Sequence, residues 1–329
     1  MIPVTLLTGQ LGAGKTTVLQ RMLADPRMAG TAVLVNEFGE IGLDHELLAP
    51  LDGDVRLLRS GCICCTLRED VAGAIRDLID RAARGEIPPL TRVVIETTGL
   101  ADPFPLLSTL AADPVLRNQV CSGGVITVFD AIHGSNALYD DVNMARRQLA
   151  AADVIAVSKR DLSTNPSIRL LMAELQQKNP LARMTFADAR LHRILPQGPR
   201  DWPAPLPGNV LRLAGRQEHD LSGLRTLTIT RPGPINWTAF GLWLTALLQF
   251  HGDKIHRVKG MLEVEPGGPP VLVNAVGFLV HMPQHLDRWP EGVPHTRLVF
   301  IFEELDPEQL RRSFEVFDRL GHAVAPLPV

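Results

Sequence analysis

Three cysteines lie within four consecutive positions of the sequence, at Cys62, Cys64 and Cys65 in the segment "RSGCICCTLRED". Thiolates are preferred ligands of Zn²⁺ and other soft divalent ions, and three of them leave one position of a tetrahedral ion open. The chain holds only four cysteines in 329 residues, which is too few for a disulfide framework. The cluster therefore predicts a transition-metal site. A buried structural role and a redox role through Cys62 and Cys65 are the alternatives.

A glycine-rich loop precedes the cysteines. Residues 9–16, "GQLGAGKT", have the pattern G-x-x-x-x-G-K-[ST] and lie between an apolar β-type run and a helical stretch. In such a loop the backbone N–H groups converge on phosphate oxygens, the lysine contacts the β- and γ-phosphates, and the hydroxyl binds Mg²⁺. The pattern predicts a nucleoside triphosphate site formed by Gly9, Gly12, Ala13, Gly14, Lys15, Thr16 and Thr17.

Two later strand ends supply further polar groups for a nucleotide. Glu96 ends the apolar run "RVVIE" and is expected to hold or orient a water on Mg²⁺, while Gly99 lets the backbone approach the γ-phosphate. The segment "SKRD" follows another apolar run. Asp161 can accept both hydrogens of the guanine N1–H and 2-amino edge, the Lys159 stem can lie over the base, and Ser158 stands where guanine sites have asparagine. Guanine is therefore expected rather than adenine. The expected catalytic residues are Lys15, Thr16 and Glu96.

These groups require a scaffold that brings strand ends to one edge. Residues 1 to about 190 alternate short β-branched runs with amphipathic helical stretches, which predicts an α/β fold with a mostly parallel sheet flanked by helices. The proline-rich stretch at residues 196–208 is typical of a connector. Strand-like and helix-like segments follow it. We expect a P-loop NTPase domain over residues 1–208 and a smaller α+β domain over residues 209–329.

Composition narrows the classes of function. Lys and Arg number 33 against 36 for Asp and Glu, so the net charge is -3 and no basic field favours nucleic acid. The N-terminal segment "MIPVTLLTGQLGAGK" has no cationic region before its apolar run and reaches a glycine-rich loop quickly. A signal peptide and a membrane span are therefore not expected, and the predicted location is the cytoplasm.

With these motifs in place, the chain resembles the CobW-like family of P-loop GTPases, which are metallochaperones. The matching segments occur in the family's order and are "TGQLGAGKTT", "VNEFGEIGLD", "SGCICC", "VVIETTGLADP", "SKRD", "RVKGML" and "RLVFIFEELD". The resemblance implies slow GTP hydrolysis with Mg²⁺, coupled to the delivery of Zn²⁺, or of Co²⁺ or Ni²⁺, to a client metalloprotein. A homodimer is a candidate assembly.

The resemblance also assigns a role to residues 36–44, "NEFGEIGLD", as the first switch, whose conformation depends on the γ-phosphate. Glu37 and Glu40 lie on this segment, so either carboxylate, or a solvent molecule, could fill the open position of a metal held by three thiolates. Nucleotide state would then change metal affinity. The chain departs from the family pattern at Gln10, where an aromatic residue is common, at Ser158, and at "FIFEELD".

Two other functions use the same residues. One is a P-loop phosphotransferase acting on a small molecule, with the cysteines as a structural metal site. The other is a metal-storage module that does not hydrolyse nucleotide.

Overall fold

The computed structural model describes residues 1–35, 56–59, 67–138, 143–189, 191, 195, 223–289 and 295–323. The chain divides into two compact units, Met1–Ala204 and Pro205–Val329. Each unit has its own sheet and its own apolar core. The proline-rich connector lies outside the described residues, so the domain boundary expected at residue 208 stays a prediction.

The first unit is built on a seven-stranded sheet in the order β3-β2-β4-β1-β5-β6-β7. Every pair of neighbours is parallel. The strands are β1 (Ile2–Gly9), β2 (Thr31–Val35), β3 (Arg56–Arg59), β4 (Arg92–Glu96), β5 (Val120–Asp130), β6 (Val154–Ser158) and β7 (Arg183–Phe186). Most of the central strands are buried along their whole length, as expected for a sheet covered on both faces. The predicted α/β architecture is confirmed.

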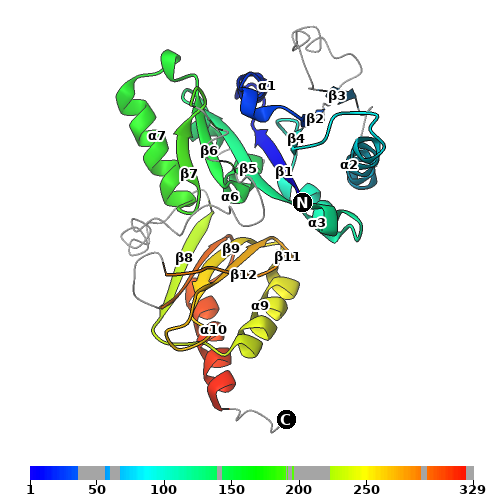
Figure 1. Ribbon diagram of the computed structural model, residues 1–329. Coiled ribbons are helices and arrows are strands. Elements are labelled where there is room, and N and C mark those ends of the chain that lie inside the picture. The colour runs from blue at the N-terminus through cyan, green and yellow to red at the C-terminus, as the bar shows by residue number, and fades with distance from the viewer. Residues whose placement is uncertain are drawn as a thin grey trace. The chain divides into compact units, whose positions relative to one another are not determined.

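Helices cover both faces of this sheet. They are α1 (Lys15–Leu23), α2 (Leu67–Ala83), α3 (Pro103–Ala112), α4 (Leu116–Gln119), α5 (Gly134–Ala137), α6 (Met144–Ala151) and α7 (Asn165–Lys178), with 3-10 turns at Pro26–Met28 and Arg160–Leu162. Helix α1 buries Val18, Leu19 and Met22 against one face of the sheet. Figure 1 shows α7, α6, α3 and α2 in a row, with each helix packed on the next.

The second unit is an antiparallel sheet with two helices packed against each other. The sheet has the order β11-β10-β9-β13-β8, with β12 paired to β10. Its strands are β8 (Arg225–Arg231), β9 (Ile255–Leu262), β10 (Val271–Val276), β11 (Leu279–Val280), β12 (Gln284–His285) and β13 (Thr296–Phe302), and its helices are α9 (Trp237–His251) and α10 (Pro307–Ala323). The core is centred on Trp243, whose ring meets Phe300 and Phe314 edge-on. The predicted α+β domain is confirmed.

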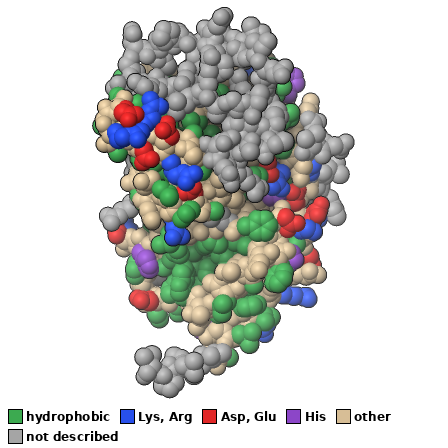
Figure 2. Space-filling view, turned by 90° about the vertical axis from the view of Figure 1, so that its right-hand side faces the viewer, with side chains coloured by type: hydrophobic (Ala, Val, Ile, Leu, Met, Phe, Trp, Pro, Cys, Tyr) green, Lys and Arg blue, Asp and Glu red, His purple; other side chains and the backbone are tan. Residues whose placement is uncertain are grey.

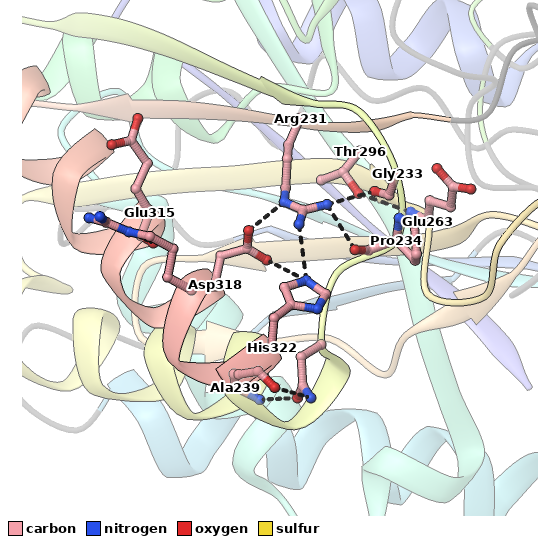
Figure 3. Close-up of polar contacts among 12 residues, drawn as sticks. Arg231, Gly233, Pro234, Ala239, Glu263, Thr296, Glu315, Asp318 and His322 are labelled. Carbon is pink, nitrogen blue, oxygen red and sulfur yellow. Dashed lines mark hydrogen bonds and ion pairs between the residues drawn. The ribbon is translucent and has the colours of Figure 1, made fainter. Parts of the chain in front are cut away.

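A polar cluster fastens the end of α10 to the turn that follows β8 (Figure 3). The Arg231 guanidinium pairs with Asp318 and lies 3.0 Å from Nε2 of His322. The side chain of Asn236 caps α9 and donates to the carbonyl oxygen of Gly321 at 2.9 Å. These contacts hold the two helices in a fixed antiparallel arrangement.

The outer face of α9 is apolar. From Trp237 to Phe250 this helix carries no charged residue, and Leu242 and Phe250 are exposed. Phe278 and Met282, which follow β10, are exposed as well. Figure 2 shows apolar side chains gathered on the side of the second unit that carries α9. The helix therefore buries one face in the core and leaves apolar side chains on the other.

Candidate nucleotide and metal site

The glycine-rich loop joins β1 to α1 through backbone conformations that favour glycine. Gly14 is the N-cap of α1 and has a φ of 91°. At Gly9, a Cβ would lie 2.3 Å from the carbonyl oxygen of Val128 on the neighbouring strand. The loop can therefore follow the end of β1 closely before turning into α1. Its N–H groups and the positive end of the helix dipole are thereby placed at the carboxyl edge of the sheet.

Thr16 and Glu96 meet at this edge. Oγ1 of Thr16 donates to Oε1 of Glu96 at 2.7 Å, although the two residues are 80 positions apart. They meet because β4 lies beside β1 in parallel, with Glu96 opposite Leu7. Glu96 is 5% exposed, and Lys15, which is 8% exposed, donates from Nζ to the carbonyl oxygen of Gln10 at 3.0 Å. A hydroxyl and a carboxylate this close together are hard oxygen ligands of the kind that suits Mg²⁺.

The expected base-binding residues follow β6. Ser158 is buried, and its hydroxyl donates to the carbonyl oxygen of Ala13 at 2.6 Å, so it ties the glycine-rich loop to the end of β6. Lys159 has a φ of 54°, and its Nζ lies 3.2 Å from Oδ2 of Asp130. Asp161 is exposed. Ser158 thus has a contact that the sequence did not predict, which holds the glycine-rich loop, and the Asp161 carboxylate is open to solvent.

Asp130 is a site residue that sequence reasoning missed. It ends β5 directly opposite Ser158 in the register with β6. Burial alone would raise the pKa of the Asp130 carboxyl, but N–H groups of His133 and Ile132 and the Lys159 ammonium outweigh burial and lower that pKa below 3.8. The charged carboxylate therefore holds the lysine that is expected to lie over the base. The run "GVITVFD", which ends at the same edge as the other site residues, was the signal available in the sequence.

The loop after β4 packs closely on the glycine-rich loop. A Cβ at Gly99 would lie 2.2 Å from the backbone nitrogen of Leu11, so only glycine fits there without a shift of backbone. Beside this contact is a cavity of about 230 Å³. Its lining residues are Gln10, Leu11, Gly99, Leu100, Ala137, Asn143, Met144 and Ala145. Gln148 of α6, a second residue that the sequence did not single out, holds two carbonyl oxygens of the same loop.

The predicted metal ligands Cys62, Cys64, Cys65, Glu37 and Glu40 lie outside the described residues, as does the predicted switch at residues 36–44. The cysteine site therefore stays a prediction. Within the ranges that the structure describes, no group of three or more His, Cys, Asp or Glu side chains could hold a metal ion. Among the same residues, no helix is long and apolar enough to cross a membrane.

Comparisons with known proteins give matches to both units. Residues 3–186 match the model of the CobW/HypB/UreG nucleotide-binding domain, and residues 224–317 match the cobalamin synthesis protein cobW C-terminal domain. The zinc chaperone YjiA of Escherichia coli is 31% identical over 95% of this chain and 98% of its own length. The zinc chaperone CobW of Pseudomonas aeruginosa is 32% identical over 93% of this chain and 88% of its own.

A solved structure agrees with these matches. The crystal structure of Zn(II)-bound YjiA GTPase from E. coli superimposes with a TM-score of 0.72 at 30% identity, over 96% of this chain and 98% of that one. The resemblance read from the motifs is thus confirmed across both units. The chain belongs to the CobW/HypB/UreG family of nucleotide-binding proteins and carries the CobW C-terminal domain.

Proposed function

We propose that this chain is a GTP-binding and slowly GTP-hydrolysing metallochaperone that delivers Zn²⁺ to a client metalloprotein. The observation that carries the nucleotide part is the Thr16–Glu96 hydrogen bond beside Lys15, at the start of α1. The metal part is supported by the names of the relatives, which are zinc chaperones and, in Schizosaccharomyces pombe, a zinc-regulated GTPase metalloprotein activator that is 33% identical over 56% of this chain.

Each residue of the nucleotide site has a proposed role. The Lys15 ammonium binds the β- and γ-phosphate oxygens, and the N–H groups of the glycine-rich loop bind the remaining phosphate oxygens. Thr16 and Glu96 would hold hydrated Mg²⁺, which neutralises charge that develops on the phosphates when it is bound. Glu96 would also hold or orient a water on that Mg²⁺. No strong general base stands out among the described residues, which suits a slow, regulatory turnover.

The base would be read at the ends of β5 and β6. Asp161 accepts from the guanine N1–H and 2-amino groups, which adenine does not present together. The Lys159 stem lies over the base, held in place by Asp130 at 3.2 Å. Ser158 supports this subsite indirectly, because its hydroxyl fixes the loop carbonyl of Ala13 at 2.6 Å.

The cargo site would be formed by the thiolates of Cys62, Cys64 and Cys65, with Glu37 or Glu40 as an exchangeable ligand. Three thiolates accept Zn²⁺, Co²⁺ or Ni²⁺, so the names of the relatives are what favour zinc. If the γ-phosphate changes the position of residues 36–44, then nucleotide changes metal affinity and, by reciprocity, metal changes nucleotide affinity. We place this activity in the cytoplasm, with the client metalloprotein as the main partner and a homodimer as a candidate assembly.

One experiment tests both parts. The protein is purified without oxygen, and Zn²⁺ affinity is measured by competition with a chelating dye in the presence of GDP or of a GTP analogue that is not hydrolysed. We expect two different affinities in the wild-type protein and one shared, weaker affinity when Cys64 and Cys65 are replaced by serine. The Cys121→Ser variant is the matched control, because this half-buried thiol lies on β5.

Three outcomes would contradict the proposal. The first is an equal Zn²⁺ affinity with both nucleotides. The second is unchanged metal transfer to a client after Lys15→Ala, which would favour a storage module. The third is a phosphorylated small-molecule product, which would favour a phosphotransferase.

A further inference from the structure

Gln148 is a fully buried amide that the proposed chemistry does not use. It lies on α6, whose other buried residues are all apolar, and its exposed fraction is 0%. A buried amide is costly unless its donors and its acceptor are all satisfied. The hydrogen-bond partners of Gln148 therefore indicate which segment of the chain its side chain positions.

Both hydrogen-bond partners of its side chain among the described residues lie in the loop that follows β4. Nε2 of Gln148 donates to the carbonyl oxygen of Gly99 at 3.1 Å and to that of Ala101 at 3.2 Å. The backbone carbonyl oxygen of Gln148 accepts from Oγ1 of Thr127 on β5 at 2.8 Å, which fixes this part of α6 to the sheet. The amide therefore acts from a rigid element onto the loop that touches the glycine-rich loop at Leu11.

The loop is anchored at its two ends. At its start, the backbone nitrogen of Thr97 donates to the carbonyl oxygen of Leu7 at 2.9 Å. At its end, Arg147 donates from Nε and Nη2 to Oδ2 of Asp102, at 2.9 Å each. Gly99 lies between these anchors and faces the cavity of about 230 Å³. The middle of the loop thus has room to shift while its ends stay in place.

Two polar atoms at this position are buried without a hydrogen-bond partner among the described residues. One is Oε1 of Gln148, an acceptor, and the other is Oγ1 of Thr98, a donor in the same loop. A buried polar group without a hydrogen-bond partner costs free energy. A slightly shifted position of the loop that gives either atom a partner would recover that cost, and a further contact with the loop could make this shifted position the stable one. Contact of the Gly99 backbone with a γ-phosphate, which the sequence leads us to expect, would be such a stabilising event.

We infer that Gln148 is a positioning residue for GTP hydrolysis. It holds the Gly99 backbone at the distance from the glycine-rich loop that the γ-phosphate requires, and its free Oε1 accepts a hydrogen bond from the loop when the triphosphate is bound. GDP has no γ-phosphate, so the residue acts on the triphosphate state and leaves GDP binding almost unchanged. This inference rests on the proposed nucleotide site.

The test compares Gln148→Leu and Gln148→Glu with Gln176→Leu. Gln176 is a matched control because its Nε2 also donates to a backbone carbonyl, that of Pro180 at 3.3 Å, away from the nucleotide. The measured quantities are kcat and KM for GTP, the Kd of GDP, the affinity ratio of a non-hydrolysed GTP analogue to GDP, and the melting temperature.

We expect both Gln148 variants to lose about tenfold or more in kcat and to have a lower analogue-to-GDP ratio, while the Kd of GDP changes by less than about twofold. If Gln148→Leu does not fold, Gln148→Glu, which has the same size, supplies the same readouts. Wild-type kcat and ratio in both variants would overturn the inference. A parallel loss of GDP affinity, kcat and melting temperature would also overturn it, because such a loss indicates a structural role alone. Failure of the wild-type protein to bind GDP would instead contradict the nucleotide site itself.

Discussion

Replacing Gly99 by alanine should disable hydrolysis by moving the glycine-rich loop. The new Cβ would lie 2.2 Å from the nitrogen and 2.5 Å from the Cα of Leu11, which are backbone atoms that cannot rotate away. Ordinary contact begins at about 3.5 Å, so the two loops must separate by more than about 1 Å. A misplacement of about 1 Å at a reacting centre costs about 100-fold in rate. Overpacking of this kind also lowers the free energy of unfolding by about 1–3 kcal/mol.

The assay measures kcat for GTP hydrolysis, the Kd of GDP and the urea midpoint of Gly99→Ala. We expect kcat to fall about 100-fold while the fold is retained. Gly73→Ala is the control, because Gly73 lies in α2 and its Cβ would meet nothing within 4 Å. That variant should keep its kcat and gain about 0.5–1 kcal/mol of stability, as an alanine does in place of glycine within a helix. A Gly99→Ala protein with wild-type kcat would refute the reasoning, since it would show that the two loops are not in contact during turnover.

Three further predictions follow from single contacts. Because hydrogen bonds lower the pKa of the Asp130 carboxyl, its charge stabilises the fold above about pH 3.9, and this contribution is lost as the pH falls through the lowered pKa. The free energy of unfolding should therefore fall less steeply with decreasing pH in Asp130→Asn than in the wild type, as measured by acid unfolding. Ser158→Ala removes the 2.6 Å hydrogen bond to Ala13 and should weaken GDP binding by about 1 kcal/mol, roughly fivefold, in a fluorescence titration. Trp243→Ala empties the centre of the second core and should lower the free energy of unfolding in urea by about 3–5 kcal/mol.

The architecture of the first unit was predictable because its signals are local. A parallel strand covered on both faces reads as a continuous apolar run, and a glycine-rich loop followed by Lys15 and Thr16 is recognisable from eight adjacent residues. The same holds for the second unit, where Asn236 at the start of α9 accepts from the backbone nitrogen of Ala239 as a helix cap does. Patterns of this kind depend on neighbours in sequence, so they are present before the chain folds.

Asp130 and Gln148 could not be assigned in the same way. In the sequence, Asp130 is one of several acidic residues that follow an apolar run, and Gln148 is a polar residue of an ordinary helix. The role of each depends on what lies opposite it, which is Lys159 for the first and the Gly99 and Ala101 carbonyls for the second. Lys159 follows β6 and is 29 positions from Asp130 in the sequence. Gly99 lies in the loop after β4 and is 49 positions from Gln148.

The sequence by itself determined the family, the order of strands and helices along the chain, the phosphate-binding loop and the candidate cysteine ligands. Only the tertiary structure decided that β4 lies beside β1, so that Glu96 accepts the Thr16 hydroxyl, and that Ser158 binds the loop carbonyl of Ala13. The physical reason is that periodicity and turn chemistry act over a few residues. The order of strands in a sheet, by contrast, is chosen by packing between segments that are far apart in the chain.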